Sequence, residues 1–190
     1  MFKSKIKSLY RKKNNTRIYQ GDIFKDIKFV TGDPETATEK DIISLPYAVV
    51  LSQDCDLQFD FNCRKTNENQ DKFLLSLLVS PAFILENFAK GEHLGDWKMN
   101  TFNDGQIDKI KNNDSLKRYH YLSGEPSFSV PELVIDFKHF FSLPRDFLYK
   151  EKKNKYIASL NEIFREELSQ RFSNYLSRIG LPELTTDKKQ

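Results

Sequence analysis

Cysteine and uninterrupted apolar sequence are both scarce in this chain. Only Cys55 and Cys63 occur among 190 residues, too few for a disulfide framework. The longest apolar run, from Phe73 to Ile84, is interrupted by two serines and a proline and falls short of the roughly 18 apolar residues that span a bilayer. No apolar stretch follows the basic N-terminus as it would in a signal peptide. We therefore expect a cytoplasmic protein that makes no membrane contact and keeps both thiols reduced.

Glycine and proline are scarce as well, with 7 residues of each, which argues against a collagen-like or linker-dominated chain. The chain is instead 38% hydrophobic and holds 16 phenylalanines, enough apolar material for a hydrophobic core. A typical domain has about 150 residues. We expect one domain over residues 18–150, followed by a C-terminal helix over 155–180 and a tail over 181–190.

Acidic residues are missing from the first part of the chain, although the formal net charge is only +3. No acid precedes Asp22, and subtracting the seven basic charges of residues 1–17 from +3 leaves about −4 for the rest. We expect a basic N-terminal arm that contacts RNA, DNA or an acidic protein, because counterion release favours such clusters. The alternative is a frayed chain end. The basic residues of the arm are Lys3, Lys5, Lys7, Arg11, Lys12, Lys13 and Arg17.

Short apolar runs separated by polar loops predict most of the secondary structure. A continuous run of β-forming residues at 48–51 is typical of a buried strand. A second buried strand at 73–79 should end at Ser80-Pro81, because proline has no N–H to donate to a neighbouring strand. We also expect strands at 18–24 (continuing over 27–30), 119–122 and 133–137, a short helix at 82–94, weak helical character at 107–110, and polar loops at 31–40 and 58–71.

The clearest single element is the C-terminal helix. Ser159 and Glu162 have the spacing of a capping box, in which each side chain bonds the backbone N–H of the other residue. Apolar residues then recur every three or four positions, and Gly180 and Pro182 indicate the end of the helix. Its apolar stripe can cover a sheet or dock against a partner protein.

The order of elements favours a mainly β fold with some α structure. Strands are mostly not separated by crossover helices, which argues against a Rossmann-type sheet. We expect a small, partly open antiparallel barrel with one short internal helix and a long amphipathic C-terminal helix.

Three fragments together resemble the PemK/MazF family of SH3-like barrels from bacterial toxin–antitoxin systems. They are Gln20-Gly21-Asp22-Ile23, the stretch 46–52, and Leu77-Leu78-Val79-Ser80-Pro81, and they lie within residues 20–85. The resemblance implies an SH3-like barrel. It also implies an arginine before the second strand and a Ser or Thr after the third, which stabilise charge at the scissile phosphate of RNA. Ser80 matches the second position, but residues 41–47 contain no basic residue.

Because the expected arginine is missing, we interpret the chain as a non-catalytic module that binds nucleic acid or protein, in a prokaryotic toxin–antitoxin or phage-defence system. The alternative is a metal-independent endoribonuclease with a rearranged active site. In it, Ser80 lies near the phosphate, Arg118 supplies the guanidinium, and Asp54 or Asp56 acts as the base. The oligomeric state stays open.

The run Gln53-Asp54-Cys55-Asp56 is a candidate site on a loop, since it directly follows a buried strand. Its acids can face a cationic partner; alternatively they cap a turn while Cys55 packs inward. Neither a cofactor nor a metal is expected. The cysteines and histidines lack the close spacing of zinc ligands, which leaves metal-dependent chemistry at the two aspartates as a weaker third class.

Two further groups are candidates for binding nucleic acid or a partner. Arg118, Tyr119, His120 and Tyr121 fall on an expected strand, so the tyrosines share one face. That face can stack against bases, or the tyrosines can simply pack inward. In the C-terminal helix, Arg171 and Arg178 are seven residues apart and lie on one face, where they bind phosphate or carboxylate or border the solvent.

Overall fold

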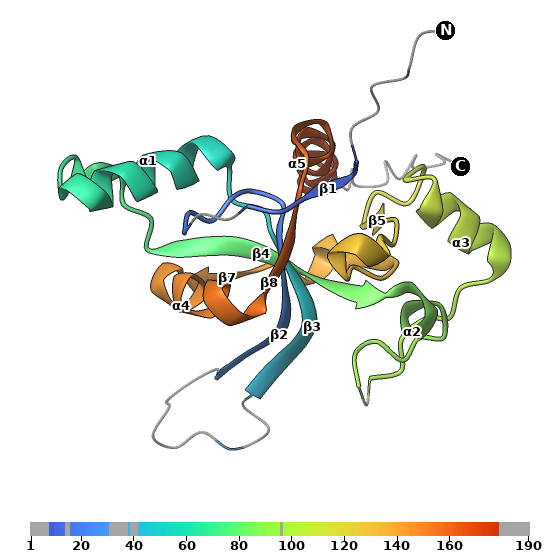
Figure 1. Cartoon of the computed structure of the whole chain (residues 1–190). Coiled ribbons are helices and arrows are strands. Elements are labelled where there is room, and N and C mark those ends of the chain that lie inside the picture. The colour runs from blue at the N-terminus through green and yellow to red at the C-terminus, as the bar shows by residue number, and fades with distance from the viewer. Residues whose placement is uncertain (1–7, 14–15, 31–37, 39–41, 96, 179–190) are drawn as a thin grey trace, which may run out of the picture.

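The computed structural model describes residues 8–13, 16–30, 38, 42–95 and 97–178 (Figure 1). Over these residues, five α-helices accompany eight strands, so the fold is mixed α/β. No helix in this part of the chain is long and apolar enough to cross a membrane. The strands are β1 (Tyr10–Arg11), β2 (Asp22–Val30), β3 (Ile42–Val50), β4 (Ser76–Ile84), β5 (Tyr119–Leu122), β6 (Leu133–Asp136), β7 (Phe141–Pro144) and β8 (Tyr156–Leu160). The helices are α1 (Asp54–Thr66), α2 (Leu85–Ala89), α3 (Asp104–Lys111), α4 (Arg145–Lys155) and α5 (Glu162–Leu176).

The strands form one antiparallel sheet in the order β1-β8-β2-β3-β4-β6-β5, with β7 paired to β4 outside this path. The sheet is not closed, because the path begins at β1 and ends at β5. The antiparallel sheet agrees with the sequence-based expectation.

Strand β4 runs from the side of the protein that carries α1 and α4 to the side that carries α2 (Figure 1). One edge pairs with β3, and the other pairs first with β7 and then with β6. The expected strand end at Ser80-Pro81 is wrong, since the strand continues to Ile84. These two residues lie between the stretches that pair with β7 and β6, so the proline falls where that ladder is interrupted.

Successive residues of the central strands point to opposite faces of the sheet and pack under different helices. Val49 belongs to the core that also contains Leu168 and Phe172 of α5. Val50 belongs to the core on the other face, which contains Leu148 of α4. Burial on both faces explains the continuous apolar run and confirms the buried strand predicted at 48–51.

A third, smaller core lies where α2 and α3 pack beside β5 and β6. Phe88 of α2 stacks on Phe102 at a centroid distance of 4.8 Å and meets Tyr119 edge-on at 5.0 Å. The strands expected near 119–122 and 133–137 and the helical character near 107–110 are all confirmed. The short helix expected over 82–94 is confined to Leu85–Ala89.

Helix α1 forms where the sequence predicts polar loops, and it is held by polar contacts. The carboxylate of Asp60 accepts hydrogen bonds from the backbone N–H of Leu74 at 2.9 Å and from the guanidinium groups of Arg64 and Arg145 at 2.7 Å each. Apolar periodicity carries no signal for such contacts. With α1, α3 and α4 present beside α2, the expectation of one short internal helix is wrong.

The C-terminal helix is shorter than predicted. Tyr156–Leu160 is strand β8, and α5 begins after Asn161, so the capping box expected at Ser159 does not form. The Ser159 hydroxyl instead donates to Asp22 in the interior of the protein. Strand β8 also extends the sheet beyond the range 18–150 expected for it. The expected end at Gly180 and Pro182, and the tail 181–190, lie outside the described residues.

Candidate functional site

The N-terminal basic residues that the structure describes are built into the fold. Tyr10 of β1 is buried, and Arg11 beside it forms an ion pair with Glu162 at 3.1 Å. Arg17 forms an ion pair with Asp54 at 2.8 Å, and the ammonium of Lys13 lies 4.4 Å from the ring centroid of Tyr19. Lys12 is exposed. The expectation of a separate arm is therefore wrong for this part of the segment; Lys3, Lys5 and Lys7 lie outside the described residues.

Residues 54–56 form the first turn of α1 and not a loop, and Gln53 is the N-cap residue of this helix. Asp54 is bound from two sides, by Arg17 at 2.8 Å and by Arg165 of α5 at 3.0 Å. Gln53 donates to the hydroxyl of Ser169 at 3.1 Å, and Asp56 is exposed. Cys55 is exposed too, so the alternative in which it packs inward is wrong.

Gln53, Asp54 and Cys55 line an open groove of about 360 Å³ between the start of α1 and α5. The two arginines already satisfy the carboxylate of Asp54, so this cluster serves to tie the N-terminal segment, α1 and α5 together. Among the described residues, no three His, Cys, Asp or Glu side chains are close enough to hold a metal ion.

Ser80 and Arg118 meet at one residue, Asp136. The Ser80 hydroxyl donates to the Asp136 carbonyl oxygen at 2.8 Å, and the serine is fully buried. Arg118 donates two hydrogen bonds to the carboxylate of Asp136, at 2.7 and 2.6 Å, which raises the pKa of Arg118. Since Asp54 is bound by Arg17 and Arg165 instead, the candidate catalytic residues belong to two separate networks.

The aromatic residues around Arg118 are mainly structural in their contacts. Tyr119 packs edge-on against both Phe88 and Phe102, as in the inward-packed alternative, while Tyr121 donates to Glu132. His120 points to the opposite face, where burial lowers its pKa to about 3, with a further contribution from Arg171. The imidazole is therefore neutral at pH 7.

The two arginines of α5 differ in their surroundings. Arg171 donates to the backbone carbonyl oxygens of Asn113 and Tyr119, and so fastens α5 to the segment between α3 and β5. Arg178 is exposed, with its guanidinium carbon 3.9 Å from the ring centroid of Tyr175. Arg178 is thus the freer of the two.

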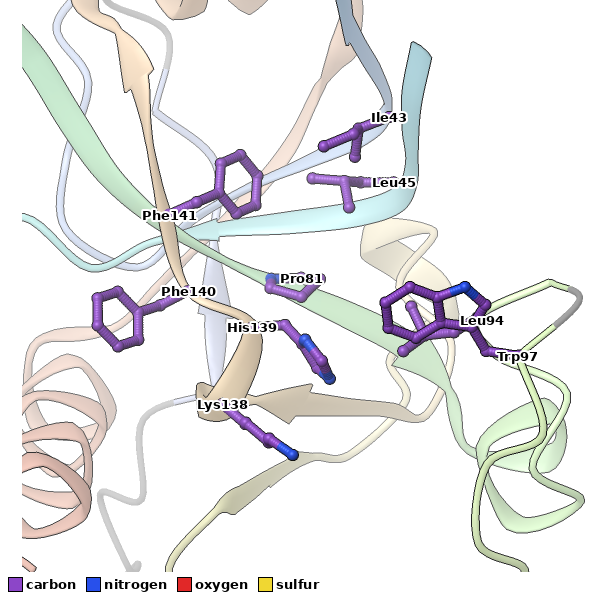
Figure 2. A pocket seen from close by; sticks show the side chains of 9 residues that line it. All are labelled: Ile43, Leu45, Pro81, Leu94, Trp97, Lys138, His139, Phe140 and Phe141. Carbon is purple, nitrogen blue, oxygen red and sulfur yellow. The ribbon is translucent and has the colours of Figure 1, made fainter. Parts of the chain in front are cut away.

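An open, mainly apolar pocket of about 470 Å³ lies next to Asp136 (Figure 2). Four separate segments build it: β3, the middle of β4, the segment after α2, and residues 138–141, which lead into β7. We call it the Trp97 pocket. It is lined by Ile43, Leu45, Pro81, Leu94, Trp97, Lys138, His139, Phe140 and Phe141.

Large apolar side chains are exposed in the Trp97 pocket. The exposed fractions are 67% for Trp97 and 40% for Ile43, whereas the ring of Phe140 is turned away from the other lining side chains (Figure 2). Pro81 lies on β4 in the middle of the pocket, and the ring of Phe141 is turned toward Ile43 and Leu45 (Figure 2). The ring of Phe140 packs edge-on against the ring of Phe172 of α5, at a centroid distance of 5.3 Å.

Asp136 positions the polar part of the pocket. Its carboxylate accepts a hydrogen bond from the backbone N–H of Lys138 at 3.0 Å, which caps the short 3-10 helix η4 (Phe137–His139). Lys138 and His139 therefore leave the backbone next to a buried carboxylate that Arg118 holds in place. Burial lowers the pKa of His139, although Asp136 lies 3.6 Å from its Nε2 atom and opposes the shift.

Sequence reasoning missed this pocket because its residues come from four segments with different local patterns. Two signals were present. Trp97 is the single tryptophan and occurs in an irregular segment rich in Asn and Asp, and Phe140-Phe141 follows a basic pair, Lys138-His139. A large aromatic residue outside any expected strand or helix indicates a surface site when no core is available for it.

Comparison with known proteins adds no functional assignment. No model of a known protein family matches the chain, and no curated protein matches it. The function is therefore inferred from the geometry of the Trp97 pocket and from the contacts of the candidate catalytic residues.

Proposed function

We propose that this chain is a non-catalytic module that binds a partner protein through the Trp97 pocket. One observation carries the proposal: an open cavity of about 470 Å³ whose lining includes the exposed side chains of Trp97 and Ile43. Contiguous apolar surface of this kind is costly in water and marks interaction sites in folded proteins. Aromatic side chains are also the residues that most often dominate binding energy at protein interfaces.

Binding is favoured over catalysis by the contacts of the candidate catalytic residues. A serine near a scissile phosphate must reach solvent, but Ser80 is fully buried and its hydroxyl donates to a backbone carbonyl. Arg118 already uses two donors on Asp136, and Asp54 is neutralised by two arginines. The endoribonuclease alternative would require these pairs to break before substrate binds.

A protein partner is favoured over nucleic acid by the composition of the pocket. Seven of its nine lining residues are apolar and only Lys138 is cationic at neutral pH. Interfaces with DNA or RNA are more polar and much more densely cationic. Arg11 and Arg17 are also engaged in ion pairs within the protein. The SH3-like barrel, the PemK/MazF kinship and the toxin–antitoxin or phage-defence setting stay predictions that rest on the three sequence fragments.

A direct test is available because Trp97 is the only tryptophan, so its fluorescence reports on this pocket alone. A display library of random twelve-residue peptides is selected against the full chain, and the enriched peptides are titrated by Trp97 fluorescence and by anisotropy of a labelled peptide. We expect saturable binding that Trp97→Ala weakens at least ten-fold.

The matched control is Ile163→Ala on α5, which removes an apolar side chain of similar exposure, 66%. This variant should bind as the wild type does. Pools of single-stranded RNA and DNA oligonucleotides are titrated and checked for cleavage in parallel. The proposal is overturned by peptides that bind equally to Trp97→Ala, by failure to enrich any peptide, or by oligonucleotides that displace the peptide or are cut.

A further inference from the structure

The Trp97 pocket combines an apolar interior with a single cation at its edge. Lys138 is exposed and forms no ion pair with a described residue, unlike Lys90, Lys111, Lys152 and Lys155. None of the nine lining residues carries a carboxylate. The lining of the pocket therefore includes one exposed lysine that has no ion pair with a described residue (Figure 2).

The backbone that carries Lys138 is firmly held. Its N–H donates to Asp136, and the carboxylate of Asp136 is held by the paired hydrogen bonds from Arg118. His139, the next residue, has a lowered pKa because of its burial and adds no full positive charge at neutral pH. Lys138 is consequently the group in the pocket that can select a charge on a ligand.

We propose that the occupant of the Trp97 pocket is a segment of a partner protein in which a large apolar side chain lies beside an aspartate or glutamate. The apolar side chain occupies the cavity, and the carboxylate contacts the ammonium of Lys138. The inference rests on the proposed function and adds to it the chemistry of the partner. Charge complementarity is its basis: a lone cation at the rim of an apolar site favours an anionic neighbour and disfavours a cationic one.

The apolar part supplies most of the affinity, and the charge supplies selectivity. An exposed ion pair contributes modestly and is screened by salt. Exchanging an acid for a lysine in the ligand should therefore weaken binding by about five-fold near 0.1 M salt, with a smaller difference at 0.5 M salt. The contribution of the apolar contacts to affinity should change little with salt concentration.

The test is a charge exchange between protein and peptide. The same twelve-residue library is selected against the wild type and against Lys138→Glu, and the best wild-type peptide is also made with each acid replaced by lysine. We expect the wild type to enrich Asp or Glu next to Leu, Phe or Trp, and Lys138→Glu to enrich Lys or Arg there. Lys138→Glu should weaken binding of the acidic peptide about five-fold and strengthen binding of the peptide in which lysine replaces the acid.

The matched control is Lys65→Glu, which makes the same charge change at an exposed position on α1. It should leave the preference unchanged. Peptides that need Trp97 but show no change in charge preference with Lys138→Glu would overturn this inference while leaving the proposed function intact. Peptides that do not need Trp97 would overturn the proposed function itself. If Lys65→Glu and Lys138→Glu changed the charge preference of the enriched peptides equally, the effect would come from the net charge of the protein, and the role of Lys138 would be rejected.

Discussion

Arg118, which directly precedes β5, and Asp136, at the end of β6, are joined by two hydrogen bonds of 2.7 and 2.6 Å between guanidinium and carboxylate. Asp136 is fully buried, whereas the Arg118 side chain is 24% exposed. The same aspartate accepts from the backbone N–H of Lys138 and, through its carbonyl oxygen, from Ser80. One ion pair thus links the sheet to the rim of the Trp97 pocket.

Removal of this pair should destabilise the protein and disturb the pocket. Arg118→Gln leaves a buried carboxylate without its counter-charge, and we expect a loss of about 3 kcal/mol in the free energy of unfolding. Urea unfolding measures this loss, and Trp97 fluorescence of the folded variant reports on the pocket. Lys117→Gln, an exposed neighbour, is the control and should change stability by less than about 0.5 kcal/mol. Equal effects of the two substitutions would show that the pair has no special role.

Asp60 should be essential for keeping α1 on the body of the protein. Burial raises the pKa of this carboxyl, but hydrogen bonds from Arg64, the N–H of Leu74 and Arg145 outweigh burial and lower it overall. Asp60→Asn should therefore cost about 3 kcal/mol at pH 7. Because the pKa is lowered in the folded state, this stabilisation is present above the unfolded pKa of about 4 and is lost as pH falls below it.

The comparison for Asp60 is Asp71→Asn, whose side chain is 75% exposed. Urea unfolding measures the loss of stability of both variants at pH 7 and at pH 3.5. The cost of Asp60→Asn should shrink at the lower pH, whereas Asp71→Asn should be nearly neutral at both. A cost that does not change with pH would mean that the charge of Asp60 is not what stabilises α1.

His120 should make the protein less stable in mild acid. Its pKa is lowered to about 3 in the folded state by burial and by Arg171, whereas an unfolded histidine titrates near pH 6.5. Below pH 6.5 the unfolded chain therefore binds a proton that the folded chain does not. As the pH is lowered, the free energy of unfolding decreases by up to about 1.4 kcal/mol per pH unit. The effect extends down to the folded pKa.

His120→Gln removes this contribution. Unfolding experiments between pH 7.5 and 5 should show a shallower loss of stability for the variant. The burial of His93 and His139 lowers their pKa values too, so part of the slope should persist. An unchanged slope in His120→Gln would show that this histidine does not remain neutral in the folded protein.

A buried charge pair joins β2 to α4 and predicts strong coupling. Asp22 is fully buried and lies 3.0 Å from the ammonium of Lys152; burial raises the pKa of Asp22, although Lys152 and Ser159 oppose the shift. Lys152→Met should cost about 3 to 5 kcal/mol because it leaves the carboxylate without its partner. The double variant Asp22→Asn/Lys152→Met should lose clearly less than the sum of the single variants, and simple additivity would contradict the coupling.

Local sequence patterns predicted the elements that depend on apolar residues close together in the chain. The strands at 48–50, 119–122 and 133–136 were predicted from short runs of apolar, β-forming residues, because such runs are typical of buried strands. Elements held by distant polar contacts were missed. Helix α1 depends on the bond between Asp60 and Arg145, 85 residues apart, and the Ser159 hydroxyl is used by Asp22 instead of a helix N-terminus.

The sequence by itself determined an antiparallel sheet with apolar central strands, a C-terminal amphipathic helix and two free thiols, because composition and short-range periodicity specify these. Tertiary structure alone decided that several N-terminal basic residues are built into the fold, that Ser80 and Arg118 serve Asp136, and that Trp97 borders a pocket. The reason is physical. A carboxylate takes whichever donors folding brings near it, and a pocket made by four segments exists only after the sheet has paired.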